Sequence, residues 1–300
     1  PRPAATARAG RAAERGDPAP HRAARHRPAA PGATPRPACR QPEATAAGPR
    51  FPTMSAQATG TSPTQVIAAH GWAGDSRCWA PWAALASQRG WRIRCLERGY
   101  GQLAPAVPHW DSLSGRRIVL AHSLGPHLLP HSIWRDATAA VLLTSFAAFV
   151  PPGRAGRPLA AGLRGMAAQL EAGDDATAAM LHQFLAKAAD PFPASRLPAG
   201  PLEQGITPEG RQRLRGDLHL LARCTDLPVG LSDRIPVLIV EALDDQIVCE
   251  ASRELLRQAL PQATVWSLQP AGHGLLRSDG EHAAPSLVSA VLQWMADGPP

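Results

Sequence analysis

The sequence predicts an α/β fold, with a mostly parallel six-stranded sheet that carries helices on both faces. Short apolar runs rich in β-branched residues alternate with stretches of helical pattern from Gln65 onward. Runs that are apolar at every position are typical of strands buried on both faces, as in parallel sheets. Their alternation with helical segments indicates that those helices cover the two faces.

Six runs fit the strand pattern in chain order. The first, QVIAA, is followed by a loop and a helical stretch, and the later runs are also separated by helical patterns. Strands are therefore expected at residues 65–69, 91–97, 116–121, 139–145, 236–242 and 264–269. Helices are expected at residues 79–88, 124–134, 251–259 and 283–295.

One interval interrupts this alternation. Residues 150–232 contain no convincing strand, and Pro- and Gly-rich joints separate three helical stretches at 159–173, 175–189 and 209–224. This interval is too long for an ordinary connection, so it is expected to be a helical lid over the site. The core is then expected to comprise residues 61–149 and 233–300.

The N-terminal segment differs in composition. Residues 1–53 hold ten Arg, no Lys and three acids, and therefore carry the whole net charge of +7. Residues 54–300 hold 21 basic and 21 acidic residues, which argues against nucleic-acid binding by the folded part. Residues 1–60 have too few large apolar side chains to form a core and are expected to be a disordered leader. Met54, just before the first strand, is the favoured natural start.

The cysteines and the hydropathy pattern give further expectations. The five cysteines (39, 78, 95, 224 and 249) are scattered without a C-x-x-C pair, which favours reduced thiols in a cytoplasmic protein. No apolar run has the length of a membrane-spanning helix. The histidines other than His70 and His273 lack ligand spacing with acids or cysteines, and no metal is expected. No cofactor is expected either.

Residues 119–127, VLAHSLGPH, predict a nucleophile elbow. A buried strand ends at Ser123 and a helical pattern follows at once, which is the context that the elbow motif G-x-S-x-G requires. Gly125 satisfies the last position, and Ala121 adds only a methyl group at the first. The alternative interpretation is an ordinary serine that caps the next helix.

Two later segments supply partners for Ser123 in the expected chain order of serine, acid and histidine. Asp244 and Asp245 follow a buried strand, and His273 lies in a Gly-flanked loop after the last strand. We expect Ser123 to be the nucleophile, His273 the general base and Asp245 the acid that orients His273. Asp244 is interpreted as a turn residue.

An oxyanion hole is expected beside Ser123. One donor should be the backbone N–H of Leu124, the residue after the nucleophile. The other should come from the loop HGWAGDS at residues 70–76, where Gly71 permits a close approach and Trp72 supplies the N–H. His70 is interpreted as a structural hydrogen-bonding residue.

The segments HGWAGDSRCW, RGYGQ, LAHSLG, LDDQIV and AGHG resemble the α/β-hydrolase superfamily. The sequence is most similar to one branch, the pimeloyl-[acyl-carrier protein] methyl ester carboxylesterases of biotin synthesis. The resemblance covers residues 65–297 and implies an α/β-hydrolase fold without cofactor and a strand order of 4-3-5-6-7-8 in the scheme of that fold. It also implies hydrolysis of a methyl ester on a pimeloyl chain.

The resemblance further implies that Phe184, Leu185 and Ala186 line the acyl channel from the lid. With Trp72, Ser123, Leu124 and His273 they form the expected substrate site. It implies acyl-carrier protein as a partner of a monomeric enzyme, although the arginines that the family carries near this lid segment are mostly Ala, His or Gln here. Basic residues cluster instead at Arg154, Arg157 and Arg164 and at Arg211, Arg213 and Arg215, and either set can also be a solvated helix face. Alternatives are another carboxylesterase or thioesterase, or a binding protein that has lost turnover.

Overall fold

The computed structural model describes residues 63–112, 115–276 and 284–298. The expected leader at residues 1–60 lies outside these ranges. Six strands form one sheet in which every neighbouring pair is parallel, in the order β2-β1-β3-β4-β5-β6. This confirms the predicted sheet and its strand order. The strands are β1 (Gln65–Ala69), β2 (Arg92–Cys95), β3 (Arg117–His122), β4 (Ala139–Leu143), β5 (Val237–Ala242) and β6 (Thr264–Leu268).

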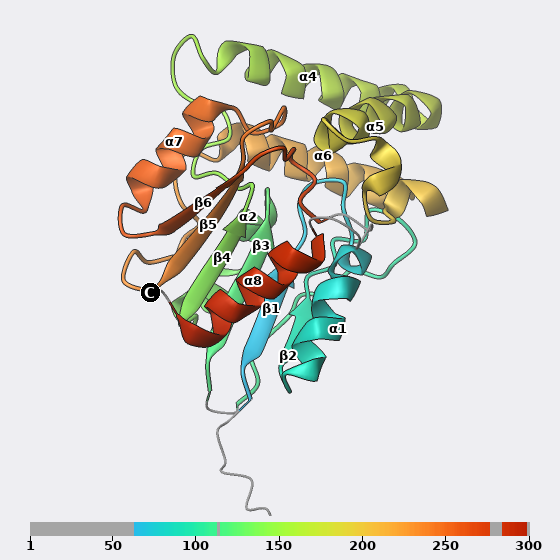
Figure 1. Cartoon of the computed structure of the whole chain (residues 1–300). Coiled ribbons are helices and arrows are strands. Elements are labelled where there is room, and N and C mark those ends of the chain that lie inside the picture. Colours follow the sequence, from blue (N-terminus) through green and yellow to red (C-terminus); the bar gives the residue numbers. More distant parts are fainter. Residues whose placement is uncertain (1–62, 113–114, 277–283, 299–300) are drawn as a thin grey trace, which may run out of the picture. The chain divides into compact units, whose positions relative to one another are not determined.

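The central strands are buried because their alternate side chains enter two different cores. Val66 and Ala68 of β1 pack with α1 (Ala80–Gln88) and α8 (Ala284–Asp297). Ile67 and Ala69 point to the other face, toward α3 (His131–Arg135) and α7 (Glu250–Ala259). Figure 1 shows α1 and α8 on the near face of the sheet. An apolar residue at every strand position is therefore required here.

The prediction of one continuous helix at residues 124–134 is wrong. The structure divides it into α2 (Gly125–Leu128) and α3, with extended backbone at Leu129 and Pro130 between them. Proline has no N–H for an i→i−4 hydrogen bond, and it disfavours helical backbone at the preceding residue. The chain therefore breaks its helical path between α2 and α3, shortly after β3 ends.

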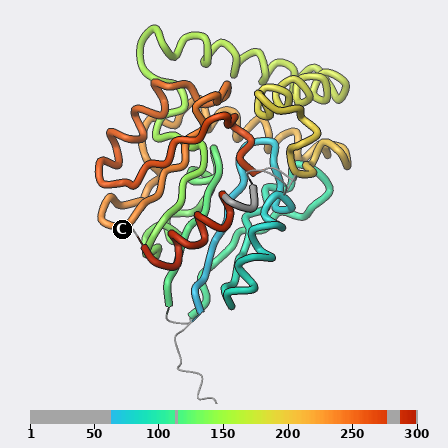
Figure 2. The backbone as a smooth tube through the Cα atoms, viewed as in Figure 1, coloured from blue at the N-terminus to red at the C-terminus, as the bar shows by residue number. Residues whose placement is uncertain are grey.

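Three long helices occupy the interval between β4 and β5: α4 (Arg157–Ala172), α5 (Asp174–Ala189) and α6 (Pro208–Arg223). Their apolar faces share a third core with Trp72, Tyr100 and Phe146 of the sheet-end loops. Figure 2 shows these helices, green to yellow-orange, gathered at one end of the sheet. Short 3₁₀ helices complete the structure at Ser76–Trp79, Ala194–Arg196 and Pro201–Gln204. Among the described helices, none combines the length and apolar character needed to cross a membrane.

Candidate active site

Ser123 occupies a strained position directly after β3. Its φ is +56°, in the left-handed region that non-glycine residues rarely adopt. Its N–H donates to the carbonyl of Leu143 at 2.9 Å, and its own carbonyl accepts from Ser145 Oγ at 2.8 Å. These bonds hold a backbone conformation that Ser123 would not adopt alone, as expected for a nucleophile elbow.

Close packing explains the small residues around Ser123. A Cβ on Gly125 would lie 2.3 Å from the carbonyl oxygen of Ala69, and one on Gly71 would lie 2.8 Å from Ser123 Cβ. Both glycines are therefore required by contact with neighbouring backbone or with the serine itself. Ala121 is fully buried within β3, where its methyl group packs in the core beside α3. The first position of the elbow thus accommodates alanine.

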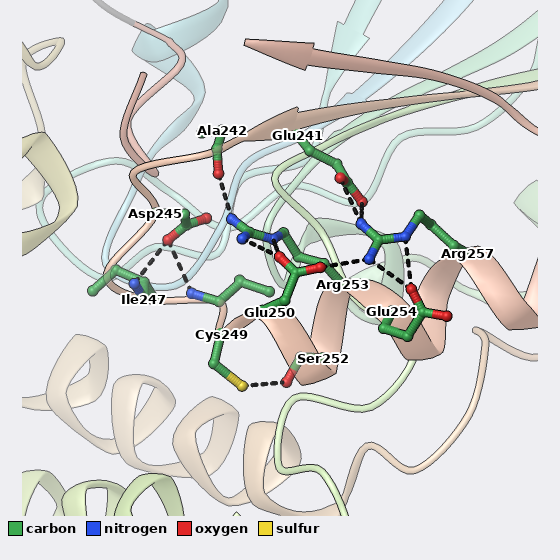
Figure 3. Close-up of polar contacts among 11 residues, drawn as sticks. Glu241, Ala242, Asp245, Ile247, Cys249, Glu250, Ser252, Arg253, Glu254 and Arg257 are labelled. Carbon is green, nitrogen blue, oxygen red and sulfur yellow. Dashed lines mark hydrogen bonds and ion pairs between the residues drawn. The ribbon is translucent and has the colours of Figure 1, made fainter. Parts of the chain in front are cut away.

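The structure brings Ser123, His273 and Asp245 into one hydrogen-bonded chain. Ser123 Oγ lies 2.9 Å from His273 Nε2, and His273 Nδ1 lies 2.9 Å from Asp245 Oδ2. The other oxygen of Asp245 accepts the backbone N–H groups of Ile247 at 2.7 Å and Val248 at 2.9 Å. Figure 3 shows Asp245 held by these two amides. With Nδ1–H donating to the carboxylate, Nε2 is free to accept the serine proton.

The environment keeps Asp245 ionised. Burial opposes the charged form, but the facing His273 and the hydrogen bonds from His273, Val248 and Ile247 outweigh it and hold the pKa of Asp245 below its usual value. The side chain is fully buried. A fixed negative charge therefore faces His273 at neutral pH.

Asp244 has a different role. Its Oδ2 accepts the N–H of Ala271 at 3.2 Å, and its own N–H donates to the carbonyl of Ala271 at 2.9 Å. These bonds tie the end of β5 to the loop that carries His273. Asp244 is thus a structural residue of the turn, as its sequence position suggested.

His122 contacts His273 of this hydrogen-bonded chain, although sequence reasoning gave it no role. Its Nε2–H donates to the backbone carbonyl of His273 at 2.9 Å, and Thr144 Oγ1 donates to the same oxygen at 3.1 Å. Burial, followed by the nearby His273, lowers the pKa of His122 to about 3. A neutral His122 therefore holds the histidine loop in place, and its position next to Ser123 was the only signal in the sequence.

His70 has the structural role expected for it. Its Nδ1–H donates to the carbonyl of Gly71 at 2.8 Å, and its Nε2 accepts the N–H of Arg98 at 3.3 Å. Burial lowers the pKa of His70 and keeps the ring neutral. Both ring nitrogens are occupied by backbone groups, so the imidazole shapes the loop that leads to Trp72.

Arg253 is a second residue that sequence reasoning missed. It is buried on α7 and donates to the carbonyl of Ala242, the last residue of β5, while its guanidinium also pairs with Glu250. Arg257, one turn later, binds Glu241 at 2.7 Å. Figure 3 shows both arginines reaching from α7 to the end of β5. They fasten the strand end from which the loop of Asp245 departs.

The expected oxyanion residues adjoin Ser123. Leu124 follows it directly and is fully buried, and the contact of Gly71 with Ser123 brings the neighbouring Trp72 to the same place. The Trp72 indole N–H donates to the carbonyl of Leu214 on α6 at 2.8 Å. Its ring meets Phe184 of α5 edge to face, with centroids 5.0 Å apart. The loop that carries Trp72 is thus joined to α5 and α6.

Two cavities meet at the Trp72–Phe184 pair, because both residues line each of them. The Ser123 cavity, of about 310 Å³, contains Ser123 and is lined mainly by Leu159, Leu163, Met166, Met180, Leu218 and Ile247. The His273 cavity has a volume of about 340 Å³, and His122, His273 and Leu185 are among the residues that line it. Both volumes are in the range of small-molecule sites.

The expectation for Ala186 is wrong. Phe184 lines both cavities and Leu185 lines the His273 cavity, but Ala186 is exposed and lines neither. Each helical residue rotates by about 100° from the previous one, so three consecutive residues of α5 cannot all face the site. Ala188, half a turn further, is buried and lines the His273 cavity instead.

The described residues contain no cluster of three or more His, Cys, Asp or Glu side chains that could hold a metal ion. Cys78, Cys95, Cys224 and Cys249 are free thiols, and Cys39 lies outside the described residues. Burial raises the pKa of Cys95 and of Cys224 to about 11, so these thiols stay protonated at neutral pH.

No protein-family model matches the chain, and no curated protein sequence matches it. Solved structures do match. An esterase from Exiguobacterium antarcticum has a TM-score of 0.54 at 15% identity, covering 79% of this chain and 93% of that one. A hydrolase from Pseudomonas aeruginosa PA01 has a TM-score of 0.51 at 19% identity, covering 78% and 90%. A pyrethroid hydrolase from Sphingobium faniae JZ-2 has a TM-score of 0.50 at 21% identity, covering 79% and 99%. The chain therefore has the α/β-hydrolase fold.

Proposed function

We propose that the protein is a serine hydrolase of carboxylic esters. The observation that carries this proposal is the hydrogen-bonded chain from Ser123 through His273 to Asp245, with Ser123 at positive φ. A helix-capping serine needs neither the strained backbone nor a histidine at 2.9 Å. The combination is what acyl transfer through a covalent intermediate requires.

In the proposed reaction Ser123 Oγ attacks the ester carbonyl carbon while His273 Nε2 takes the serine proton. The N–H groups of Trp72 and Leu124 stabilise the oxyanion of the tetrahedral intermediate. When the intermediate collapses, His273 gives its proton to the departing alcohol and an acyl group remains on Ser123. Water then attacks the acyl group while His273 takes one of its protons. The second tetrahedral intermediate collapses, His273 returns the proton to Ser123 Oγ, and the carboxylic acid leaves. Asp245 keeps His273 in the tautomer that these steps need.

For the natural substrate, the sequence resemblance suggests the methyl ester of a pimeloyl chain on acyl-carrier protein. The apolar Ser123 cavity supports this proposal, because each buried methylene contributes about 0.8 kcal/mol. Arg154, Arg157 and Arg164 support it as well. All three are exposed, Arg154 just before α4, Arg157 at its start and Arg164 two turns later, and no acidic side chain of the described residues pairs with them.

The other basic cluster is less available to a partner. Arg211 pairs with Asp174 at 2.6 Å, and Arg215 pairs with Glu171 at 3.0 Å. Arg213 donates to the carbonyl of Gly99 at 2.8 Å. These contacts hold α6 against its neighbours, so we propose the α4 cluster as the surface for an acidic carrier protein.

A second candidate is hydrolysis of an ester whose alcohol is larger than methanol. The observation that favours it is the His273 cavity, which adjoins the base and exceeds the needs of a methyl group. Complementation of a biotin auxotroph that lacks the pimeloyl ester hydrolase distinguishes the two candidates in cells. Growth is expected for the first candidate, and failure to grow with a stable, ester-cleaving protein favours the second.

The hydrolase proposal is tested by Ser123→Ala. We expect hydrolysis of a p-nitrophenyl ester to fall on the order of 10³-fold or more, because nucleophile and base act as a unit. A fluorophosphonate probe should label the wild type and not the variant. Hydrolysis that persists after this substitution would show that Ser123 is not the nucleophile. A wild-type protein that neither hydrolyses the ester nor reacts with the probe would be better described as a binding protein.

A further inference from the structure

The two cavities divide the reacting groups between them. Ser123 lines the first cavity and not the second, whereas His273 lines the second and not the first. Trp72 and Phe184, in edge-to-face contact, stand at the boundary. A bound ester must cross this boundary with its carbonyl carbon beside Ser123 and its two halves on opposite sides.

Proton transfer decides which half lies on which side. The acyl carbon becomes bonded to Ser123 Oγ, while the leaving oxygen receives its proton from His273 Nε2. The alcohol half must therefore extend on the His273 side. Resting on the proposed hydrolase activity, we infer that the His273 cavity binds the alcohol of the ester and the Ser123 cavity binds the acyl group.

The lining of the His273 cavity defines the class of alcohol. Leu185, Ala188, Leu197 and Leu276 give it apolar walls. Of its two carboxylates, Asp75 is paired with Arg77 at 2.7 Å, so the negative charge that faces a ligand is that of the exposed Glu203. Lys187 lines the other cavity. An anionic alcohol or thiol, such as a phosphate-bearing carrier arm, would meet like charge on the His273 side. The structure thus assigns to this side an uncharged, apolar alcohol larger than methanol, which favours the second candidate function over a methyl ester.

Two glycines permit a matched test of the assignment. Gly162 of α4 lines only the Ser123 cavity, and Gly200, before the 3₁₀ helix at Pro201–Gln204, lines only the His273 cavity. A Cβ at either position would meet no atom within 4 Å. Gly200 is extended, with φ of −136°, and Gly162 is helical, so both tolerate other residues. The Cβ of a leucine therefore fits at either site without a clash, and we expect its side chain to narrow the cavity that the position lines.

The measurement is kcat/KM for methyl butanoate, benzyl butanoate and methyl octanoate. The alcohol ratio compares the benzyl with the methyl ester, and the acyl ratio compares octanoate with butanoate. For the wild type we expect an alcohol ratio above about 10, since each buried methylene equivalent is worth up to about fourfold. Gly200→Leu should lower the alcohol ratio at least about tenfold, and Gly162→Leu the acyl ratio by a similar factor.

Gly165→Leu is the control on α4, because Gly165 lines neither cavity and also has open space at its Cβ position. It should leave both ratios unchanged. A measurement on the wild type alone adds to the test: benzyl alcohol should inhibit at a concentration at least about tenfold lower than methanol does.

The assignment is overturned if the two variants exchange their effects, if neither ratio changes, or if methyl and benzyl esters react equally well. In those cases hydrolysis and probe labelling of Ser123 persist, so the hydrolase proposal survives. Absence of hydrolysis together with absence of labelling overturns the hydrolase proposal and the cavity assignment with it.

Discussion

Asp245→Asn changes one atom of the triad and leaves its shape intact. Asp245 accepts three hydrogen bonds, from the N–H groups of Ile247 and Val248 and from His273. If the amide oxygen of the asparagine keeps the two backbone donors, its NH₂ group must face His273. Two donors then oppose each other unless the imidazole changes tautomer. In the other tautomer Nε2 carries the proton and cannot accept one from Ser123.

The expected loss follows from this geometry. With the base in the wrong tautomer, kcat should fall on the order of 10⁴-fold, which corresponds to about 5 kcal/mol of transition-state stabilisation. KM should change much less, because Asp245 does not line the His273 cavity or the Ser123 cavity. Asp244→Asn is the matched control. Its new side chain retains an acceptor for Ala271, so a change of less than about tenfold is expected.

The assay is the initial rate of p-nitrophenyl butanoate hydrolysis at neutral pH, with circular dichroism to verify that both variants fold. Comparable losses in Asp244→Asn and Asp245→Asn would refute the assignment of the acid. More than about a tenth of the wild-type rate in Asp245→Asn would refute the role of the carboxylate altogether.

Three further predictions concern stability, measured by urea unfolding. Gly125→Ala should lower the free energy of unfolding by about 1–3 kcal/mol, because its Cβ clashes with a backbone oxygen of β1. Ala121→Gly should lower it by only about 0.5–1 kcal/mol and should not raise the rate of ester hydrolysis. Equal losses of stability would contradict this interpretation of the elbow. The pKa of about 3 for His122 means that the unfolded chain binds its proton first as pH falls. The contribution of neutral His122 to the free energy of unfolding is complete above about pH 6.5 and declines toward pH 3. His122→Gln should therefore reduce the slope of this free energy against pH by up to about 1.4 kcal/mol per pH unit. An unchanged slope would exclude a buried neutral histidine. Arg253→Met removes the buried side-chain donor to the last carbonyl of β5, which then keeps only the N–H of Asp245 at 3.4 Å. It should cost about 1–3 kcal/mol, against almost nothing for the exposed Arg135→Met; matching costs would show that Arg253 does not anchor the strand.

The sequence alone determined the features that local rules govern. Each strand was predicted to within two residues at its ends. In the central strands β1, β3, β4 and β5, burial on both faces demands apolar residues almost throughout. Ser123 could be located because a buried strand, a serine at its end and a glycine at position 125 occur together. The split at Pro130 also follows from a local rule, the missing N–H of proline, although the helical periodicity outweighed it in the prediction.

Tertiary structure decided the features that depend on how distant segments meet. Neighbouring aspartates are nearly equivalent in sequence, and only the approach of the loop at Ala271 directs Asp244 away from His273. The rotation of α5 against the sheet-end loops determines that Phe184 faces the site and Ala186 does not. Spacing along the chain cannot reveal such contacts, because hydrogen bonds and side-chain packing between elements depend on their docking. The two cavities beside Ser123 and His273 are products of that docking.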